Sequence, residues 1–476
     1  MDLGPKNELM GKTVGRLIRR DALPNMLNIL DKARAVEVAN VLSNLTRPER
    51  RTAFRSLLDH DVAKCAEALT ELPTEVAVGL LESLGVHELE PLFQRMTPDD
   101  AAVFMEELSE DLREELLSRM KTDEKAEVQE LLSFPSETAG RIMTPNVFSL
   151  DESLTVGDAI RRLQDLSDEL EAVFYVYVVD GRNHLVGVVS MRQLLLIYLR
   201  ASEEPLKSVM STDVISVRTH TDQEEVTRMV ANYNLLGIPV VDEENKLVGI
   251  ITVDDVIDVI RDEATEDILG LAGVEADDRA LGGPLRSFRR RIPWLLVSLM
   301  TAFFACYVVK SFEESVLANA VQYAILLPLV AALGGQAATQ TLTVIVRGIS
   351  TGEVTSETRR RAFIKEVLVG FVNGGVLGAL GGLVAGILFG AAVGMVIFGS
   401  LVVLMVIAAL AGTVVPFTLR RLNFDPAIAS SVFVITITDV LGFFVYLLLA
   451  SWAIGQVGDV PPEMPGGPQA PLSPGG

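Results

Sequence analysis

Apolar residues are concentrated in the last part of this 476-residue chain, beginning at Ile292. Before about residue 290, no apolar run approaches the ~20 residues that a helix needs to cross the ~30 Å hydrocarbon core of a bilayer. Beyond that point such runs follow one another with short polar interruptions. We therefore predict five transmembrane helices, at residues 292–309, 317–346, 367–389, 392–418 and 427–454.

Basic residues gather on one side of these predicted spans. They stand before the first span, between the second and third, and between the fourth and fifth, as Arg286, Arg289, Arg290, Arg291, Arg347, Arg359, Arg360, Arg361, Lys365, Arg420 and Arg421. The opposite loops contain only Lys310, and the tail contains no Lys or Arg. The positive-inside rule then predicts a multi-pass protein of the cell (inner) membrane, with a cytoplasmic N-terminus and an external C-terminus.

Composition and motifs exclude several functions. The chain has 41 Lys and Arg against 63 Asp and Glu, a net charge of −22, which disfavours nucleic acid as a partner. The two cysteines, Cys65 and Cys306, are too few for a disulfide framework or a thiolate metal site. The motifs GxxxxGK[ST], HExxH and GxSxG are absent, so we do not expect an enzyme.

The cytoplasmic part contains an internal repeat. YVVDGRNHLVGVVSMRQLL (177–195) aligns with PVVDEENKLVGIITVDDVI (239–257), within copies at 143–200 and 210–261. Each copy predicts the order strand, helix, strand, tight polar turn, strand, helix. This duplicated unit resembles a tandem pair of CBS domains, which are α/β modules that sense ligands and transmit their state to a neighbouring channel, transporter or enzyme.

Upstream of the repeat, residues 20–135 predict short helices separated by polar breaks. Thr97 and Ser109 are suited to be N-caps, and Pro98 stands at the favoured first helical position. Short helices at a regular period indicate an all-α superhelical domain rather than an enzyme core.

Asp439 is the most informative residue within the predicted spans. A carboxylate in apolar sequence costs ~2.5–3.5 kcal/mol on insertion scales, so it should face a polar pathway or a partner. No Lys or Arg lies at comparable depth in any span. We favour a carboxylate on an ion pathway over a protonated Asp that bonds a neighbouring helix.

Glycine and polar residues interrupt two further spans. In the second, Pro328, Gly334 and Gly335 predict a broken helix over 328–343, where irregular backbone lines a wet cavity. This segment also carries Gln336, Thr339, Gln340, Thr341 and Thr343. The third span predicts a close-packing face from a glycine at every fourth position, Gly374, Gly378, Gly382, Gly386 and Gly390.

An acidic helix face precedes the membrane part. Its members, Asp255, Asp258, Asp262 and Glu266, recur at helical spacing. Such a row repels itself unless cations lie between its members. A solvated acidic helix is the alternative interpretation.

Together these features resemble the MgtE-type magnesium transporters over nearly the whole chain. The most specific matches are THTDQEEVTRMVANYNLLGIPVVDEENKLVGIITVDDVIDVIRDEATEDI, the second span, and FDPAIASSVFVITITDV around Asp439. The resemblance implies a multidomain homodimer. Its segments are a superhelical N domain (1–136), CBS domains at 137–200 and 201–261, an acidic connecting helix (262–290), a five-helix transmembrane domain (291–455) and a disordered tail (456–476).

The resemblance also implies a function and a set of metal ligands. Asp439 would hold hydrated Mg²⁺ in a pore shared by two copies, and cytoplasmic Mg²⁺ would close that pore. The remaining implied ligands are Glu67, Asp99, Asp222, Glu224, the Ala231 carbonyl, Asp255, Asp258, Glu263, Glu266, Asp267 and Asp425. The family's second CBS unit can bind ATP, and Thr252 and Asp255 match the ribose-binding pattern T-x-x-D.

Three positions depart from the family pattern. Asn234 stands where the family often has Asp, Gln336 where it usually has Asn, and Ser431 where an Asn lies near the pore entrance. We expect weaker binding at one sensor site and altered selectivity or gating. Two other functions stay open: transport of another divalent cation, Co²⁺ or Mn²⁺, and nucleotide sensing by a membrane protein that conducts nothing.

Overall fold

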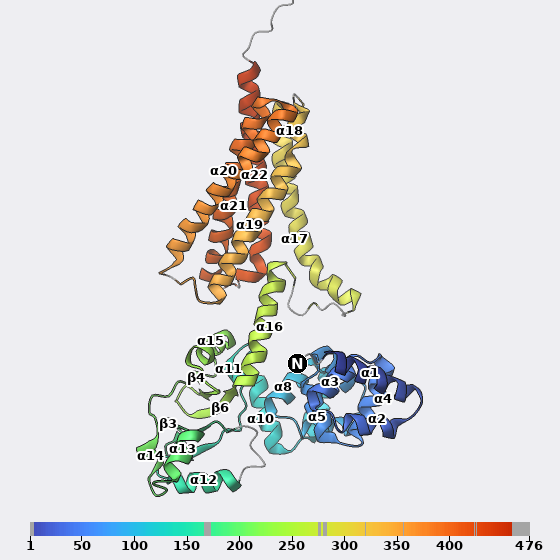
Figure 1. Ribbon diagram of the computed structural model, residues 1–476, viewed down its shortest axis with the longest axis vertical. Helices are drawn as coiled ribbons and strands as arrows, with labels where there is room; N and C mark the ends of the chain where they lie inside the picture. The colour runs from blue at the N-terminus through green and yellow to red at the C-terminus, as the bar shows by residue number, and fades with distance from the viewer. Residues whose placement is uncertain are drawn as a thin grey trace, which may run out of the picture. The chain divides into compact units, whose positions relative to one another are not determined.

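The structure, a computed structural model, describes residues 4–165, 173–274, 278, 283–318, 320–355, 357–422, 424 and 426–458. The chain forms two compact units, Met1–Arg261 and Asp262–Gly476. Figure 1 labels their helices and strands. The prediction of a helical N domain, a tandem CBS pair and five apolar helices is confirmed.

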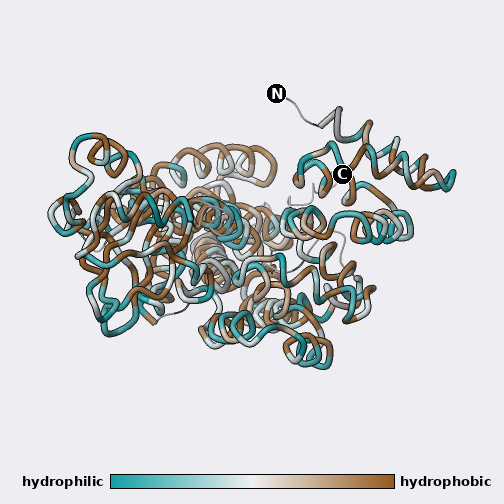
Figure 2. Tube along the Cα trace, turned by 90° about the horizontal axis from the view of Figure 1, so that it is seen from below, coloured by the Kyte–Doolittle hydropathy of each residue, from teal (hydrophilic) through white to brown (hydrophobic). Residues whose placement is uncertain are grey.

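The N domain consists of short helices whose apolar faces meet in one core. In chain order they are α1 (Gly4–Arg19), α2 (Leu23–Leu30), α3 (Ala35–Ser43), α4 (Arg47–Leu58), α5 (Val62–Thr70), α6 (Thr74–Leu81), α7 (Val86–Phe93), α8 (Pro98–Glu107), α9 (Glu110–Arg119) and α10 (Thr122–Ser133). Figure 2 shows hydrophobic and hydrophilic residues alternating along such helices. Thr97 and Ser109 occupy the N-cap positions of α8 and α9, as predicted, although neither side chain bonds the helix backbone.

The two CBS units have the predicted element order. The first contains β1 (Ser149–Asp151), α12 (Val156–Asp165), β2 (Tyr175–Val179), β3 (Leu185–Ser190) and α13 (Met191–Tyr198). The second contains β4 (Val217–Arg218), α15 (Gln223–Tyr233), β5 (Gly237–Val241), β6 (Leu247–Thr252) and α16 (Val253–Leu271). Short helices α11 (Ala139–Ile142) and α14 (Leu206–Val209) precede the two units. Each sheet pairs its first two strands in parallel and its last two antiparallel.

Reciprocal hydrogen bonds relate the two copies. Asn183 and Asn245 both adopt the left-handed conformation in the turn before β3 and β6, which suits Asn. The Asn183 Nδ2 donates to the Leu247 carbonyl over 3.0 Å, and the Asn245 Nδ2 donates to the Leu185 carbonyl over 3.2 Å. The repeat read from the sequence is therefore also a structural repeat.

The second CBS unit, rather than the first, shares the core of the N domain. Buried residues of the N domain and of β4–β6, such as Met105, Val240 and Ile251, belong to one continuous cluster. The first unit packs its own cluster around Val156 and Val178. Carboxylates between the N domain and the second CBS unit therefore lie on elements that share one packed core.

Among the described residues, the second compact unit, Asp262–Gly476, contains five helices that are long and apolar enough to cross a membrane. They lie at Ser287–Ser311, Val321–Ser350, Arg359–Phe389, Ala391–Arg421 and Ser431–Gly455. The elements are α17 (Pro284–Ser311), a short π-helical segment η1 (Glu313–Leu317), α18 (Val321–Ile325), α19 (Leu327–Ser350), α20 (Arg359–Phe389), α21 (Ala391–Arg421) and α22 (Pro426–Gly458). α21 is the most buried of these helices, whereas α17 diverges from the others at its N-terminal end (Figure 1).

The predicted break in the second span over 328–343 is wrong. α19 is a continuous helix through that segment, and the interruption lies at Leu326, between α18 and α19. Pro328 stands in the first turn of α19, where its missing N–H costs no hydrogen bond. The Tyr446 hydroxyl donates to the Tyr323 carbonyl over 2.9 Å, so α22 stabilises the backbone beside the interruption.

The predicted glycine face of the third span is confirmed for most of its length. A Cβ on Gly374, Gly378 or Gly382 would lie 2.7–2.9 Å from backbone atoms of α21. Small residues thus bring the two helices into close backbone contact. Gly390 is outside this face, because it ends α20 with a φ of 102°.

Gly378→Leu should therefore separate α20 from α21 and destabilise the membrane unit. Inserting a large side chain into a packed contact typically costs about 1–3 kcal/mol, and here the obstacle is backbone. The matched control is Gly375→Leu, because nothing lies within 4 Å of a Cβ at that position. Thermal unfolding of the full chain in detergent measures both. Equal midpoints for the two variants would contradict the packing described here.

Candidate cation sites

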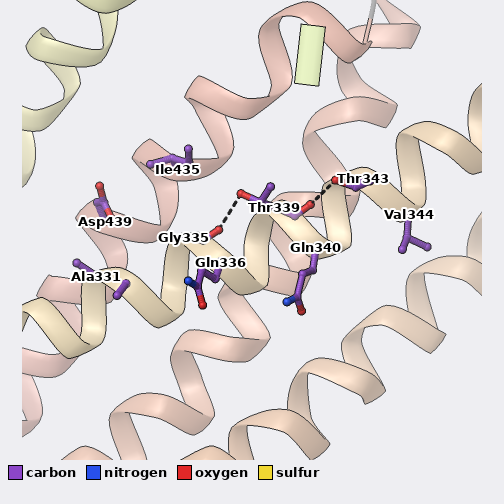
Figure 3. A pocket seen from close by; sticks show the side chains of 10 residues that line it. Ala331, Gly335, Gln336, Thr339, Gln340, Thr343, Val344, Ile435 and Asp439 are labelled. Atoms are coloured by element: carbon purple, nitrogen blue, oxygen red, sulfur yellow. Dashed lines mark hydrogen bonds between the residues drawn. The ribbon is translucent and has the colours of Figure 1, made fainter. Parts of the chain in front are cut away.

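Asp439 lies on α22 beside a largely open cavity of about 870 Å³. Figure 3 shows the cavity wall, which α19 and α22 form together. Its lining residues are Ala331, Ala332, Gly335, Gln336, Thr339, Gln340, Thr343, Val344, Ile435 and Asp439. Asp439 is half-buried, and the described part of the chain offers its carboxylate no hydrogen bond or ion pair.

The polar side chains of α19 supply oxygen atoms to this wall. The Thr339 hydroxyl donates to the Gly335 carbonyl and the Thr343 hydroxyl donates to the Thr339 carbonyl, each over 2.9 Å. Their protons are thereby used, and the oxygens keep lone pairs for other partners. Gln336 and Gln340 extend from α19 one turn apart (Figure 3). A wall that combines these Gln and Thr side chains with a carboxylate offers oxygen atoms to a hydrated divalent cation, although apolar residues make up the rest of it.

A second cavity, of about 410 Å³, shares Thr339, Ile435 and Asp439 with the first. Residues 271–274, which follow the end of α16, form part of its wall together with α17. Gly273 has a φ of 70°, and a Cβ there would lie 3.8 Å from the Ser431 Oγ. The segment after the acidic helix therefore borders the cavity that contains Asp439. Two of the family departures, Gln336 and Ser431, line these cavities.

Two further contacts fix the connection between α16 and the membrane helices. The Ser350 hydroxyl, at the end of α19, donates to Asp267 Oδ2 over 2.9 Å. Asp278, which is 8% exposed, accepts a 2.7 Å hydrogen bond from the Ser287 hydroxyl and forms a 2.5 Å ion pair with Arg291. These bonds lower the pKa of Asp278. Sequence reasoning did not identify Asp278, because its partners Ser287 and Arg291 lie 9 and 13 positions further along the chain.

A separate pair of carboxylates lies within the compact unit Met1–Arg261. Asp99, in the first turn of α8, accepts a 2.9 Å hydrogen bond from the Thr144 hydroxyl, while its Oδ1 is buried without a partner among the described residues. Asp255, in the first turn of α16, accepts a 2.5 Å hydrogen bond from Thr252. Burial, with a contribution from the charge of Asp99, raises the pKa of Asp255 to about 6. Two neighbouring, partly desolvated carboxylates favour a proton or a cation between them.

The other predicted ligands are more scattered. Asp222 is the N-cap of α15, where its side chain accepts from the Glu224 N–H over 2.8 Å. Ala231 lies in the last turn of α15, before Asn234, which has the left-handed conformation of a helix C-cap. This conformation favours Asn over most residues, which gives the departure at Asn234 a structural reason.

Most of the remaining predicted ligands lie at the surface. Glu67 is exposed on α5, and Asp258 is exposed on α16, 3.8 Å from Arg261. Glu263 and Glu266 lie on α16 and each has an interaction partner, whereas Asp425 lies outside the described residues. Within the described part of the chain, no three His, Cys, Asp or Glu are grouped closely enough to hold a metal ion. Mg²⁺ retains several of its waters, so it needs fewer direct protein ligands than such a group supplies.

Glu366 is a buried acid that sequence reasoning did not identify. The predicted third span begins at residue 367, whereas α20 begins at Arg359 and holds Glu366 with 4% exposure. Its neighbour Lys365 forms an ion pair with it, with Nζ 2.5 Å from Oε1.

Family comparisons cover most of the chain. Residues 33–137 match the family described as the MgtE intracellular N domain, and residues 139–200 and 206–262 match the CBS domain. Residues 327–449 match the family described as "Divalent cation transporter". The last of these contains Asp439 and both helices of the cavity described above.

Three curated proteins, each named magnesium transporter MgtE, are similar along most of their length. The Bacillus subtilis protein is 33% identical over 91% of this chain and 95% of its own. The proteins of Enterococcus faecalis and Thermus thermophilus are 36% and 38% identical, over 69% and 68% of this chain and 72% of each relative.

Two solved structures align with about half of this chain. The soluble part of a magnesium transporter aligns with 54% of this chain and 99% of its own, at 29% identity and a TM-score of 0.49. The cytosolic domain of the Mg²⁺ channel MgtE in complex with ATP aligns with 52% of this chain and 99% of its own, at 30% identity and the same TM-score.

Proposed function

The chain belongs to the MgtE family of magnesium transporters, and on this premise we propose that it conducts hydrated Mg²⁺ across the cell membrane along a pathway that passes Asp439. The observation that carries this proposal is that, within the described residues, the Asp439 carboxylate is unpaired and lies beside a cavity whose wall includes Gln336, Thr339, Gln340 and Thr343. A carboxylate at membrane depth without a protein partner is costly unless an ion or water occupies its surroundings.

A second copy of the chain would complete the pathway. The cavity at Asp439 is open on one side, and two such carboxylates facing each other form an anionic ring suited to a dication. Apolar side chains on α13, Leu195, Leu196, Tyr198 and Leu199, are exposed at 42–79%. They support dimerisation through the CBS pair as well, because exposed apolar groups of this kind mark interaction surfaces.

Regulation by cytoplasmic Mg²⁺ is the second part of the proposal. The cation would bind between carboxylates such as Asp99 and Asp255 and offset their repulsion. In the membrane unit, residues 271–274 would then rest against the Asp439 cavity, with Asp267 bonded to Ser350. Closure requires that Mg²⁺ bind the closed state more tightly, because equal affinity for both states shifts no population.

Nucleotide binding by the second CBS unit is a minor part of the proposal. Thr252 and Asp255 match the ribose-binding pattern, but here they bond each other at the start of α16. ATP would have to compete with this local hydrogen bond.

Flux through reconstituted protein tests the function directly. Liposomes that contain the full chain and a Mg²⁺-sensitive dye should fill when Mg²⁺ is added outside, and Co²⁺ or Mn²⁺ in parallel gives the selectivity. Faster entry of Co²⁺ or Mn²⁺ at equal concentration would assign the chain to another cation. No flux of any divalent cation would favour the sensor without conduction.

The proposed orientation has its own test. A reporter fused after Gln456 should be accessible from outside the cell, because the basic residues lie in the loops of the opposite side. A fusion at the N-terminus is the control and should report from the cytoplasm. Two cytoplasmic signals would contradict an odd number of spans.

A further inference from the structure

A third cavity, of about 190 Å³, lies on another side of α19 from the open face of the Asp439 cavity. Its wall includes Gln340, Thr341, Glu366 and Asn373. Gln340 and Val344 line both this cavity and the one that contains Asp439. The two cavities are therefore separated by α19 itself.

Glu366 makes polar contacts to both sides of this cavity. The Thr341 hydroxyl of α19 is within 3.4 Å of Glu366 Oε2, to which it donates, and the Lys365 Nζ lies 2.5 Å from Oε1. Thr341 is 8% exposed and Glu366 is 4% exposed. The Thr341 contact is long for an O–H···O hydrogen bond. It still matters to Glu366, because each lost partner leaves a desolvated charge less well compensated.

The same part of α19 is packed tightly against α21. A Cβ on Gly412 would lie 2.9 Å from the Ala338 carbonyl oxygen and from the Thr341 Cβ. A Cβ on Gly370 would lie 2.7 Å from the Met405 carbonyl oxygen, so α20 and α21 are equally close. Thr341 is thus fixed between α21 and the carboxylate of α20.

Helix geometry relates this contact to the transport site. Thr341 is two residues from Thr339, and ~100° of rotation per residue places the two on nearly opposite faces of α19. Thr343 is two residues further on and shares the face of Thr339, which lines the Asp439 cavity. The contact of Thr341 with Glu366 lies on the face of α19 opposite the Asp439 cavity. A rotation of α19 that breaks this contact would also move Thr339 and Thr343.

We propose that Glu366 is a positioning residue for cation transport, which holds the rotation of α19 through Thr341 so that Thr339, Thr343 and Gln336 line the Asp439 cavity. This inference rests on the proposed function, since it concerns the geometry of the same pathway. Apolar contacts alone allow a helix to turn or slide, whereas a directional hydrogen bond to a buried charge selects one register.

The test uses the full chain in liposomes and compares isosteric variants. Thr341→Val and Glu366→Gln each weaken the contact and should lower the maximal Mg²⁺ flux about tenfold, the effect of a change of about 1.4 kcal/mol. Both should also change the ratio of Co²⁺ to Mg²⁺ flux, because the oxygens around the ion are displaced. Thr341→Ser keeps the hydroxyl and should restore both quantities.

Controls separate this role from general stability. Thr413→Val removes another buried hydroxyl, which bonds the Ala409 carbonyl of its own helix, and should leave flux and ratio unchanged. The double variant Thr341→Val/Glu366→Gln should be no worse than the poorer single variant, because both act through one contact. If Glu366→Gln does not fold, the comparison of Thr341→Val with Thr341→Ser tests the positioning role by itself.

Several results would overturn the inference. Wild-type flux and ion ratio in a folded Thr341→Val protein would do so, as would an equal loss in Thr413→Val or no rescue by Thr341→Ser. Asp439→Ala, measured in the same liposomes, separates this failure from failure of the proposed function. If Asp439→Ala loses flux while Thr341→Val has wild-type flux, the proposed pathway past Asp439 stands and only the role of Glu366 is rejected.

Discussion

Asp439→Ala should abolish Mg²⁺ uptake while the protein remains a folded, membrane-inserted chain. The side chain makes no hydrogen bond or ion pair within the described residues, so its removal breaks no contact there. A contact between a charged group and its partner contributes ~1.5–3 kcal/mol, which corresponds to a loss of about 10- to 100-fold in ion occupancy. Growth of a transporter-deficient strain and flux into liposomes both measure the loss.

Two substitutions at the same position separate charge from shape. Asp439→Asn keeps the size of the side chain without its charge and should be as inactive as Asp439→Ala. Asp439→Glu keeps the charge and should retain part of the flux. Near-normal flux in a folded Asp439→Asn protein would show that Asp439 is a helix–helix contact, the alternative that the sequence left open.

Asp255→Asn should leave the transporter open at internal Mg²⁺ concentrations that close the wild type. Asp255 lies beside Asp99, whose Oδ1 is buried without a partner, and burial raises the pKa of Asp255 to about 6. A cation bound between Asp255 and Asp99 would be stabilised most by the negative charge of Asp255, which the substitution removes. Flux as a function of internal Mg²⁺ measures the change, and the concentration for half-inhibition should rise about tenfold or more, the effect of ~1.4 kcal/mol.

The neighbouring Asp254 provides a matched control. Asp254→Asn removes the same charge one residue away, but this side chain is exposed and should have little influence on inhibition. Protease resistance of the full chain with and without millimolar Mg²⁺ gives a second readout, which Asp255→Asn should make independent of Mg²⁺. Identical inhibition curves for Asp255→Asn and the wild type would assign the acidic helix to a solvated surface.

Local patterns in the sequence determined the number and type of elements. Five apolar runs gave five membrane helices, because the transfer free energy of each residue acts whatever its neighbours in space. The repeat gave the order of strands and helices in both CBS units for a similar reason: alternation and turn residues, such as Asn183 and Asn245, act over a few positions. Asp439 was identifiable because a carboxylate in a long apolar run is itself exceptional.

Contacts between distant segments were decided by the tertiary structure alone. The interruption of the second span lies at Leu326 rather than at Gly334, because Tyr446 of α22 stabilises the Tyr323 carbonyl while Gly334 packs against Leu404. Asp99 and Asp255 are far apart in sequence and meet through a shared core. Glu366, one residue before the predicted third span, is buried in contact with Thr341 and Lys365. The cost of a buried charge depends on which groups surround it, and only the packed chain specifies those groups.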